Sequence, residues 1–354
     1  MMPNKNRKVM CHTMKALVKY GKGIEGIELR DIPEPTPKAN ELKLKVLSVG
    51  ICGTDIHIMN DEYPYNAPVV MGHEYIGVVA DMGKDVKDFK IGERVVSLTS
   101  VYTCGHCVYC GQGLRMLCAE RKSIGSGLNG AMAEYMVVPS DLAYHIPPEA
   151  PYGEELAMCE PLACCVRAVQ ERSIVRAGDI VLVSGPGTIG QLCAQLCKMQ
   201  GARVIVSGTE KDVERLKVAK SLGADVVVQA GEALKEAVYS ISPLGVDIAL
   251  ECAGAAPSAS ACVELLKKQG NYTQVALYKG PIPFDLNQFL FKELTLHTTY
   301  AQEPTSWERL MSILSTGKLV LAPLFDNTLS IDDWKAGFDR TIALEGFKTA
   351  LRPS

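Results

Sequence analysis

Three side chains of the types that bind zinc fall within 23 residues near the start of the chain: Cys52, His73 and Glu74. A thiolate, an imidazole and a carboxylate can hold Zn²⁺ with its fourth position open to a substrate, as a catalytic zinc site requires. Thr54 and His57 follow the cysteine and add a hydroxyl and a second imidazole. Each such residue alone is more often a packed side chain than a ligand. Their grouping favours a catalytic metal site, with Glu74 as one of its carboxylates.

A second cluster of zinc-binding side chains has the regular spacing Cys104-x2-Cys107-x2-Cys110-x7-Cys118. Four thiolates complete the tetrahedral coordination of Zn²⁺ and leave no position for a substrate. A zinc ion bound here would stabilise the loop and take no part in a reaction. We therefore expect a structural zinc site. His106, inside the loop, is expected to be exposed and not a ligand.

A glycine-rich loop begins the second half of the chain and reads Gly185-Pro186-Gly187-Thr188-Ile189-Gly190. It follows the apolar segment 180–183 and precedes the helical pattern of residues 191–199. Glycines in this setting allow a tight turn and let the backbone approach a pyrophosphate at a helix N-terminus. The loop predicts a dinucleotide site, with contacts from Gly185, Gly187, Ile189 and Gly190.

The choice between NAD and NADP depends on the end of the next strand. Gly208 stands where NAD-binding folds commonly carry the acidic residue that binds the ribose. Glu210, two residues later, can take this role, or it can be a solvated residue in the first turn of the next helix. Without an acid, Lys211 or Arg215 can accept the 2′-phosphate of NADP. We expect NAD, with NADP as the alternative.

Two regions with different patterns predict two domains within the 354 residues. From Met14 onward, short segments between glycines and prolines are typical of a β-rich unit. From Leu162 onward, apolar β-branched segments alternate with amphipathic stretches such as 213–222, which indicates a doubly wound parallel sheet. Its six expected strands cover residues 180–183, 204–206, 226–228, 248–250, 272–277 and 294–299. The domains are placed at 1–161 with 303–354, a tail too short to fold alone, and at 162–302.

Composition argues against several classes of function. Lys and Arg total 37 against 40 Asp and Glu, so no basic excess is available for nucleic acid. No apolar stretch approaches the roughly 20 residues of a membrane-spanning helix, and Met1–Thr13 lacks the apolar core of a secretion signal. Thirteen cysteines in such a chain indicate reduced thiols and metal binding. We expect a cytoplasmic protein with a disordered extension at Met1–Thr13.

Taken together, these motifs resemble the zinc-dependent medium-chain dehydrogenase/reductase family, which includes alcohol, polyol (sorbitol) and threonine dehydrogenases. The resemblance runs from about Met14 to Pro353 and rests on segment 50–57, on Gly72-His73-Glu74, on the four cysteines and on the glycine loop. It implies an α/β fold in which a β-rich, GroES-like zinc domain is joined to a Rossmann domain. It also implies one catalytic zinc, one structural zinc, NAD or NADP, and a homodimer or homotetramer.

The resemblance assigns further roles to single residues. Thr54 and His57 look like the hydroxyl and imidazole that relay a proton to solvent. Asp55 is similar to the residue that orients the zinc-binding imidazole. Glu210 stands five residues before Arg215, an acid-to-arginine spacing that many relatives share, and both are expected at the cofactor.

One more metal ligand comes, by resemblance, from the junction of the two domains. The segment Glu160-Pro161-Leu162 is similar to polyol dehydrogenases, whereas many alcohol dehydrogenases use a cysteine there, and Cys159 stands next to it. We favour Glu160 as the ligand and catalytic carboxylate. Either Glu160 or Glu74 can contact the zinc directly.

The implied reaction is hydride transfer between a secondary alcohol and NAD(P), with zinc binding the substrate oxygen. The junction segment favours a polyol. Sorbitol dehydrogenases carry an Arg-Tyr pair near the end of the last strand of the nucleotide domain, where this chain has Thr299-Tyr300. A bulkier, less polar alcohol such as a hydroxysteroid is therefore an alternative, and threonine is a third. A non-catalytic zinc- and nucleotide-binding protein is the alternative from another class, disfavoured because every motif above is present.

Overall fold

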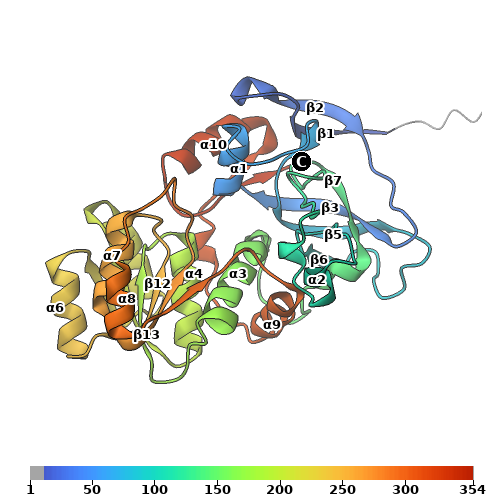
Figure 1. Cartoon of the computed structure of the whole chain (residues 1–354). Helices are drawn as coiled ribbons and strands as arrows, with labels where there is room; N and C mark the ends of the chain where they lie inside the picture. Colours follow the sequence, from blue (N-terminus) through green and yellow to red (C-terminus); the bar gives the residue numbers. More distant parts are fainter. Residues whose placement is uncertain (1–11, 354) are drawn as a thin grey trace, which may run out of the picture.

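A six-stranded parallel sheet forms one lobe of the molecule, in the order β11-β10-β9-β12-β13-β14. The computed structural model describes residues 12–353 (Figure 1). The strands are β9 (Ile180–Ser184), β10 (Arg203–Gly208), β11 (Val226–Gln229), β12 (Val246–Glu251), β13 (Leu266–Gln274) and β14 (Thr295–Thr298). The intervening helices are α4 (Thr188–Met199), α5 (Val213–Ser221), α6 (Glu232–Ile241), α7 (Ala256–Leu265) and α8 (Leu286–Lys292). This order confirms the predicted doubly wound sheet.

Alternate residues of the central strand β9 pack on opposite faces of this sheet. Val181 and Val183 share a core with the buried leucines of α4 and α5, whereas Leu182 packs with those of α6 and α7. The strand is apolar throughout because helices cover both of its faces. The expected helix at 213–222 is present as α5.

Strand β13 differs from the prediction. It begins at Leu266 and ends at Gln274, whereas the apolar pattern predicted 272–277. Its first half is polar and contains an irregularity in pairing with β12, with Gln269 at φ 60°. A strand that carries lysines and a bulge shows no apolar period.

Two mainly antiparallel sheets form the second lobe, with β15 and β16 as a parallel pair. Three strands pair in the order β2-β1-β4, and seven strands form a larger sheet, β15-β16-β3-β5-β6-β8 with β7 beside β3. The strands are β1 (Thr13–Lys19), β2 (Ile27–Pro33), β3 (Glu41–Gly50), β4 (Val69–Val70), β5 (Glu74–Met82), β6 (Arg94–Ser97), β7 (Tyr135–Pro139), β8 (Ala143–His145), β15 (Asn327–Ser330) and β16 (Thr349–Arg352). The short helices α1 (Gly53–Met59) and α2 (Val108–Gly111) lie in its connections.

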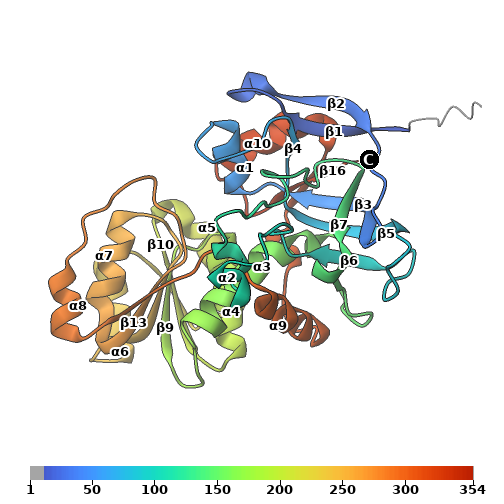
Figure 2. The same cartoon turned by 45° about the vertical axis from the view of Figure 1, so that its right-hand side comes forward.

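The C-terminal tail returns to this lobe. Strand β16 pairs with β3, with Leu351 opposite Val49. Helix α9 (Pro304–Ser315) places Trp307 in a stack on Tyr144 of β8, with ring centroids 5.3 Å apart. Helix α10 (Trp334–Ile342) covers β16. Figure 2 shows helix α3 (Cys159–Val166) between the parallel sheet and the β-rich lobe.

The N-terminal extension that was predicted at Met1–Thr13 falls mostly on residues 1–11, outside the described part. Thr13 is not part of such an extension, because it is the first residue of β1 and pairs with Pro33. No helix within residues 12–353 is both long enough and apolar enough to span a membrane.

Candidate active site

Cys52 stands between strand β3 and helix α1, at the N-terminus of the helix. The Asp55 carboxylate accepts a 2.9 Å hydrogen bond from the Cys52 backbone N–H, and the Asp55 N–H donates to the Cys52 carbonyl. These reciprocal bonds satisfy donors that a helix start leaves free. They fix the position of the cysteine, whose Sγ lies 3.7 Å from Thr54 Oγ1.

Three of the predicted ligands meet at one end of two paired strands. Strands β3 and β5 are antiparallel, with Gly50 opposite Glu74. Cys52 follows the end of β3 and His73 precedes the start of β5, so both reach the same edge. The ligand atoms of Cys52, His73 and Glu74 lie within 4.8 Å of one another. A thiolate, an imidazole and a carboxylate this close fit a zinc ion that keeps one open position.

Asp55 lies behind His73. Its side chain is fully buried, and Oδ1 is 3.8 Å from His73 Nδ1. Burial raises the pKa of Asp55, although the His73 charge opposes this. For His73, burial lowers the pKa, but the Asp55 and Cys52 charges outweigh it and raise the pKa well above its usual value. The contact supports the predicted role of Asp55 in orienting His73.

Lys348 is a member of the site that sequence reasoning missed. Its Nζ lies 2.7 Å from Glu74 Oε2, and both side chains are less than 10% exposed. The same Nζ donates to the Ile51 carbonyl at 3.2 Å. Burial lowers the pKa of Lys348, but the neighbouring Glu74 and Cys52 charges outweigh it and the pKa is raised. No spacing pattern marks this lysine, which belongs to the C-terminal tail.

Glu160 lies beside the group of three ligands without belonging to it. Its Oε1 accepts a 2.7 Å hydrogen bond from Gln302 Nε2, and Gln302 also donates to Thr99 Oγ1 at 3.2 Å. Burial and the Glu74 charge raise the pKa of Glu160 to about 7, although His73 opposes this. Gln302 and Thr99 were not predicted, because single polar residues give no sequence signal.

The predicted proton relay leads outward from Cys52. Thr54 is half-buried next to the thiol, and His57, one helical turn later, has a side chain that is 40% exposed. The His57 Nδ1 lies 2.7 Å from Glu62 Oε2. Glu62, a further residue absent from the sequence prediction, therefore holds the imidazole at the surface.

The four cysteines of the second cluster converge as predicted. Sulfur–sulfur distances are 3.5 Å for Cys107–Cys110, 3.7 Å for Cys104–Cys118 and 3.8 Å for Cys104–Cys110. A tetrahedral site with Zn–S bonds of about 2.3 Å requires sulfurs about 3.8 Å apart, so the cluster fits zinc. His106 is exposed, and its Nδ1 contacts the Cys104 carbonyl at 2.8 Å.

The glycine loop connects β9 to the N-terminus of α4. A Cβ at Gly190 would lie 1.9 Å from the Gly185 carbonyl oxygen, so helix and strand can pack this closely only with glycine. At Gly187 no atom lies within 4 Å of an added Cβ, and no side chain caps the helix. The free backbone N–H groups of Thr188 and Ile189 are thus available to a pyrophosphate, which fits a dinucleotide.

The end of β10 cannot carry an acid in place of Gly208. A Cβ there would lie 2.8 Å from Pro186 Cγ and 2.9 Å from Asp212 Cβ. The following turn is closed by Asp212, which accepts hydrogen bonds from the Thr209 N–H and hydroxyl at 2.9 and 2.8 Å. Glu210 is exposed and has no ion pair among residues 12–353. Its contact with the ribose stays a prediction.

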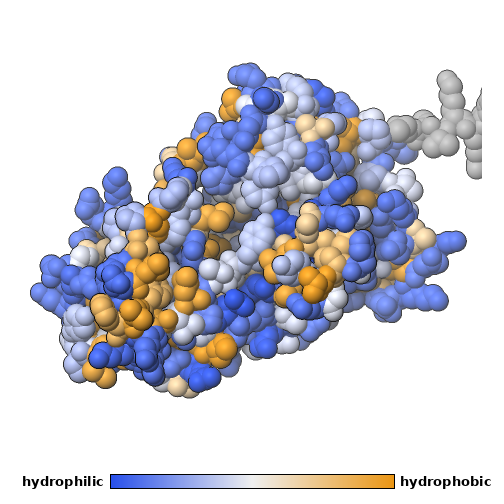
Figure 3. All heavy atoms as spheres, in the orientation of Figure 1, coloured by the Kyte–Doolittle hydropathy of each residue, from blue (hydrophilic) through white to orange (hydrophobic). Residues whose placement is uncertain are grey.

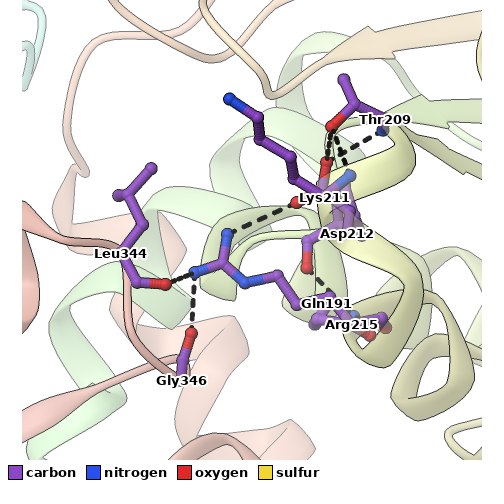
Figure 4. A network of polar contacts seen from close by, with 8 residues as sticks. Gln191, Thr209, Lys211, Asp212, Arg215, Leu344 and Gly346 are labelled. Atoms are coloured by element: carbon purple, nitrogen blue, oxygen red, sulfur yellow. Dashed lines mark hydrogen bonds and ion pairs between the residues drawn. The ribbon is translucent and has the colours of Figure 1, made fainter.

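Arg215 is engaged with the C-terminal tail. Its Nη2 donates to the carbonyls of Leu344 and Gly346 at 2.8 and 2.7 Å, and Nη1 lies 3.7 Å from Asp212 (Figure 4). The guanidinium therefore links α5 to the loop before β16. Its predicted contact with the cofactor stays a prediction.

Comparison with known proteins places this geometry in a family. The alcohol dehydrogenase GroES-like domain family matches residues 38–148, and the zinc-binding dehydrogenase family matches residues 188–316. A sorbitol dehydrogenase of Halalkalibacterium halodurans is 38% identical over 343 residues, which cover 96% of this chain and 99% of the relative. The chain belongs to the zinc-dependent medium-chain dehydrogenase/reductase family. The resemblance seen in the sequence is confirmed.

Two further relatives indicate the class of reaction and the type of cofactor. A D-arabitol-phosphate dehydrogenase of Enterococcus avium is 35% identical over 337 residues, covering 94% of this chain and 96% of the relative. A zinc-binding dehydrogenase of Sinorhizobium meliloti 1021, crystallised with NADP, has a TM-score of 0.88 and 29% identity and covers 97% of this chain and 100% of its own. The protein is an oxidoreductase that uses zinc and a nicotinamide dinucleotide.

Proposed function

We propose that this dehydrogenase oxidises a secondary alcohol of a polyol at the site formed by Cys52, His73 and Glu74. Glu160 lies beside these ligands as the second carboxylate, contacting the metal directly or through water. A structural zinc is held by the remaining cluster, Cys104, Cys107, Cys110 and Cys118. The observation that carries the proposal is the grouping of three ligands within 4.8 Å of one another. A separate cavity is lined by phenol, amide, hydroxyl and cationic side chains.

When bound, zinc supplies a Lewis acid for the substrate oxygen and the dinucleotide accepts or returns a hydride. The chain itself moves the proton. Thr54 Oγ1, next to Cys52, accepts it as it gives up its own hydroxyl proton, which would pass by way of the nicotinamide ribose to the half-exposed imidazole of His57 and then to solvent. Glu62 holds His57 Nδ1 and so keeps the ring at the surface.

The cavity supports a hydroxylated substrate over a hydroxysteroid. Its volume is about 310 Å³, and phenol, amide, hydroxyl and cationic groups interrupt its apolar walls. The lining residues are Tyr63, Pro64, Tyr65, Asn66, Arg121, Lys122, Ser123, Ser126, Gly127 and Tyr300. Phenols, an amide and hydroxyls can pair with several substrate hydroxyls, whereas an apolar substrate would leave them unpaired. The sorbitol and D-arabitol-phosphate dehydrogenases among the relatives agree with this choice.

The dinucleotide is proposed to bind through the glycine loop, with Gly185, Gly187, Ile189 and Gly190 at the pyrophosphate. Glu210, an exposed carboxylate two residues after the expected ribose position, is proposed to bind the ribose, which favours NAD. Arg215 can reach a cofactor only after it releases its two backbone carbonyls. Both cofactors therefore belong in the assay.

The proposal is tested with a panel of D-sorbitol, pentitols, a hydroxysteroid and L-threonine, each with NAD⁺ and NADP⁺. We expect kcat/KM for the best polyol to exceed that for the hydroxysteroid by about 100-fold or more, because a site built to form hydrogen bonds rejects a substrate that leaves its polar groups unpaired. A higher value with the hydroxysteroid or threonine would assign the site to that substrate. No turnover and no nicotinamide binding would support the non-catalytic alternative.

A homodimer is proposed to form along the free edge of the parallel sheet. Strand β14 is the last strand of that sheet, and apolar side chains beside it are exposed. Leu286, Leu290 and Phe291 of α8 are 70%, 69% and 74% exposed, and Leu296 of β14 is 50% exposed. Figure 3 shows apolar surface gathered over this part of the molecule. Such a patch next to the unpaired outer edge of a strand favours self-association.

Phe291→Asp is expected to shift the protein from dimer to monomer, because a charge in the centre of this patch cannot be desolvated. Light scattering during gel filtration measures the mass. Leu244→Asp is the matched control, since Leu244 is 76% exposed in a loop outside the patch. A wild-type monomer, or a dimer that persists in the Phe291 variant, would contradict this interface.

The cytoplasmic location stays a proposal that rests on cysteine usage. The cysteines of residues 12–353 are all free thiols. Four of them form the structural cluster and Cys52 belongs to the active site. Thiolate ligands persist in a reducing compartment.

A further inference from the structure

The 310 Å³ cavity is lined by the guanidinium of Arg121, which the sequence pattern did not predict. Arg121 Nη2 donates to the Tyr300 hydroxyl at 2.7 Å and lies 3.5 Å from the Tyr63 hydroxyl. Its guanidinium carbon is 5.1 Å from the centre of the Tyr300 ring, and Nη1 lies 3.6 Å from Met116 Sδ. A guanidinium has five N–H donors, so these contacts hold it in place and leave donors for a ligand.

Arg121 and Tyr300 form an arginine–tyrosine pair, although the two residues are not neighbours in the sequence. Position 299 is threonine, and the arginine that contacts Tyr300 comes from 179 residues earlier in the chain. It follows the four-cysteine loop, whereas Tyr300 follows β14. The cavity therefore has an arginine–tyrosine pair made from two separate segments.

The positive charge of this cavity is not neutralised. Arg121 and Lys122 both line it, and none of its ten lining residues is acidic. Neither cation has a carboxylate within 4.0 Å in the described chain. The acids that begin the adjoining loop are already engaged, because Asp61 pairs with Lys19 and Glu62 with His57. In a protein of net charge −3, this unpaired positive charge points to an anionic ligand.

Two walls of the cavity are linked through the chain to residues beside the active site. Tyr300 stands two residues before Gln302, which holds Glu160. Ile124 lies between Ser123 and Ser126 in the sequence, and its N–H donates to the Thr99 carbonyl. On the other side, Gly125 packs so closely on Gly72 that an added Cβ would lie 2.7 Å from its carbonyl oxygen. Both links place the cavity on the side of the active site formed by Gly72 and Glu160.

We propose that this cavity binds the anionic end of the substrate, a terminal phosphate monoester on a polyol, with Arg121 as the residue that determines this specificity. The guanidinium presents paired N–H donors to two phosphate oxygens. The Tyr300 oxygen accepts from Arg121, so its O–H is free to donate to the phosphate. Lys122 adds a second positive charge. The inference rests on the proposed polyol dehydrogenase function and specifies its substrate class.

The test compares kcat/KM for a pentitol, its terminal phosphate and the corresponding aldonate. Wild-type enzyme is expected to prefer the phosphate over the free pentitol by about 10- to 100-fold, the worth of a charged hydrogen-bonded contact. In Arg121→Gln this preference falls toward one, mainly through KM for the phosphate. In Arg121→Lys it is partly kept. Inorganic phosphate is expected to compete with the pentitol in the wild type and less well in Arg121→Gln.

Arg30→Gln is the matched control. Arg30 also stacks on a tyrosine, with its guanidinium carbon 3.9 Å from the centre of the Tyr20 ring, but it lies outside the cavity. Its substitution is expected to leave the preference unchanged. Equal use of pentitol and phosphate by the wild type would overturn the inference while the polyol function stands. Preference for the aldonate, or an equal loss on all substrates in Arg121→Gln, would also overturn it. Failure on every alcohol would instead reject the proposed function.

Discussion

Replacing Cys52 by serine is expected to abolish turnover and to lower the zinc content from two ions per chain to one. The thiolate is one of the three ligands grouped within 4.8 Å at this site in residues 12–353, and a serine hydroxyl is a poor ligand for zinc at neutral pH. Loss of the Lewis acid removes several kcal/mol of stabilisation from the transition state, which corresponds to a fall in kcat of about 1,000-fold or more. Metal analysis and steady-state kinetics measure both effects.

The remaining zinc in Cys52→Ser is expected at the four-cysteine cluster, and the fold should be retained. Chelation of the wild type should remove the more labile ion, with loss of turnover and an unchanged circular dichroism spectrum. Cys197→Ala serves as the control, since Cys197 is a buried thiol of α4 outside both clusters and this variant should keep two zinc ions and activity. A Cys52→Ser enzyme with two zinc ions and normal turnover would refute the site.

Much of the site could be predicted because its parts are local in sequence. The four cysteines lie in one loop, and their spacing alone indicated the 3.5–3.8 Å sulfur contacts. Cys52 and Asp55 share one helix start. The apolar strands of the parallel sheet were also visible, since both of their faces are buried. Local spacing and periodicity therefore predicted the fold class and which cysteine, histidine and glutamate side chains group together.

The supporting residues could not be predicted, because each comes from a distant segment. Gln302 reaches Glu160 across 142 positions, and Lys348 reaches Ile51 across 297. Arg121 meets Tyr300 across 179 positions. A single polar residue at such a distance leaves no period or spacing, and only the return of the tail onto β3 brings Lys348 to the metal site. The proposed phosphate contact uses Arg121 and Tyr300, whose pairing has no sequence signal. This explains why the sequence indicated the reaction class better than the substrate.

Lys348→Met is expected to lower the free energy of unfolding of the metal-free enzyme by about 3–5 kcal/mol, the usual effect of removing one partner from a buried ion pair. The Glu74 carboxylate is 1% exposed and loses the cation that lies 2.7 Å away. The carboxylate packs closely against Gly50, since a Cβ added to that glycine would lie 2.6 Å from Glu74 Oε2. The Glu74 side chain therefore has little room to move. Methionine keeps the volume of the lysine stem, so the loss reports the charge. Urea unfolding in a chelator measures it.

A smaller loss is expected when zinc is present, since the metal then supplies positive charge to the same carboxylate. The double variant Glu74→Gln/Lys348→Met should recover part of the stability, because no unpaired charge remains buried. Lys15→Met removes a lysine from an ion pair of the same 2.7 Å length, with Asp332, in which both side chains are well exposed. That variant should change stability little, since water screens an exposed pair. Equal unfolding of Lys348→Met and wild type in chelator would show that Glu74 does not depend on Lys348.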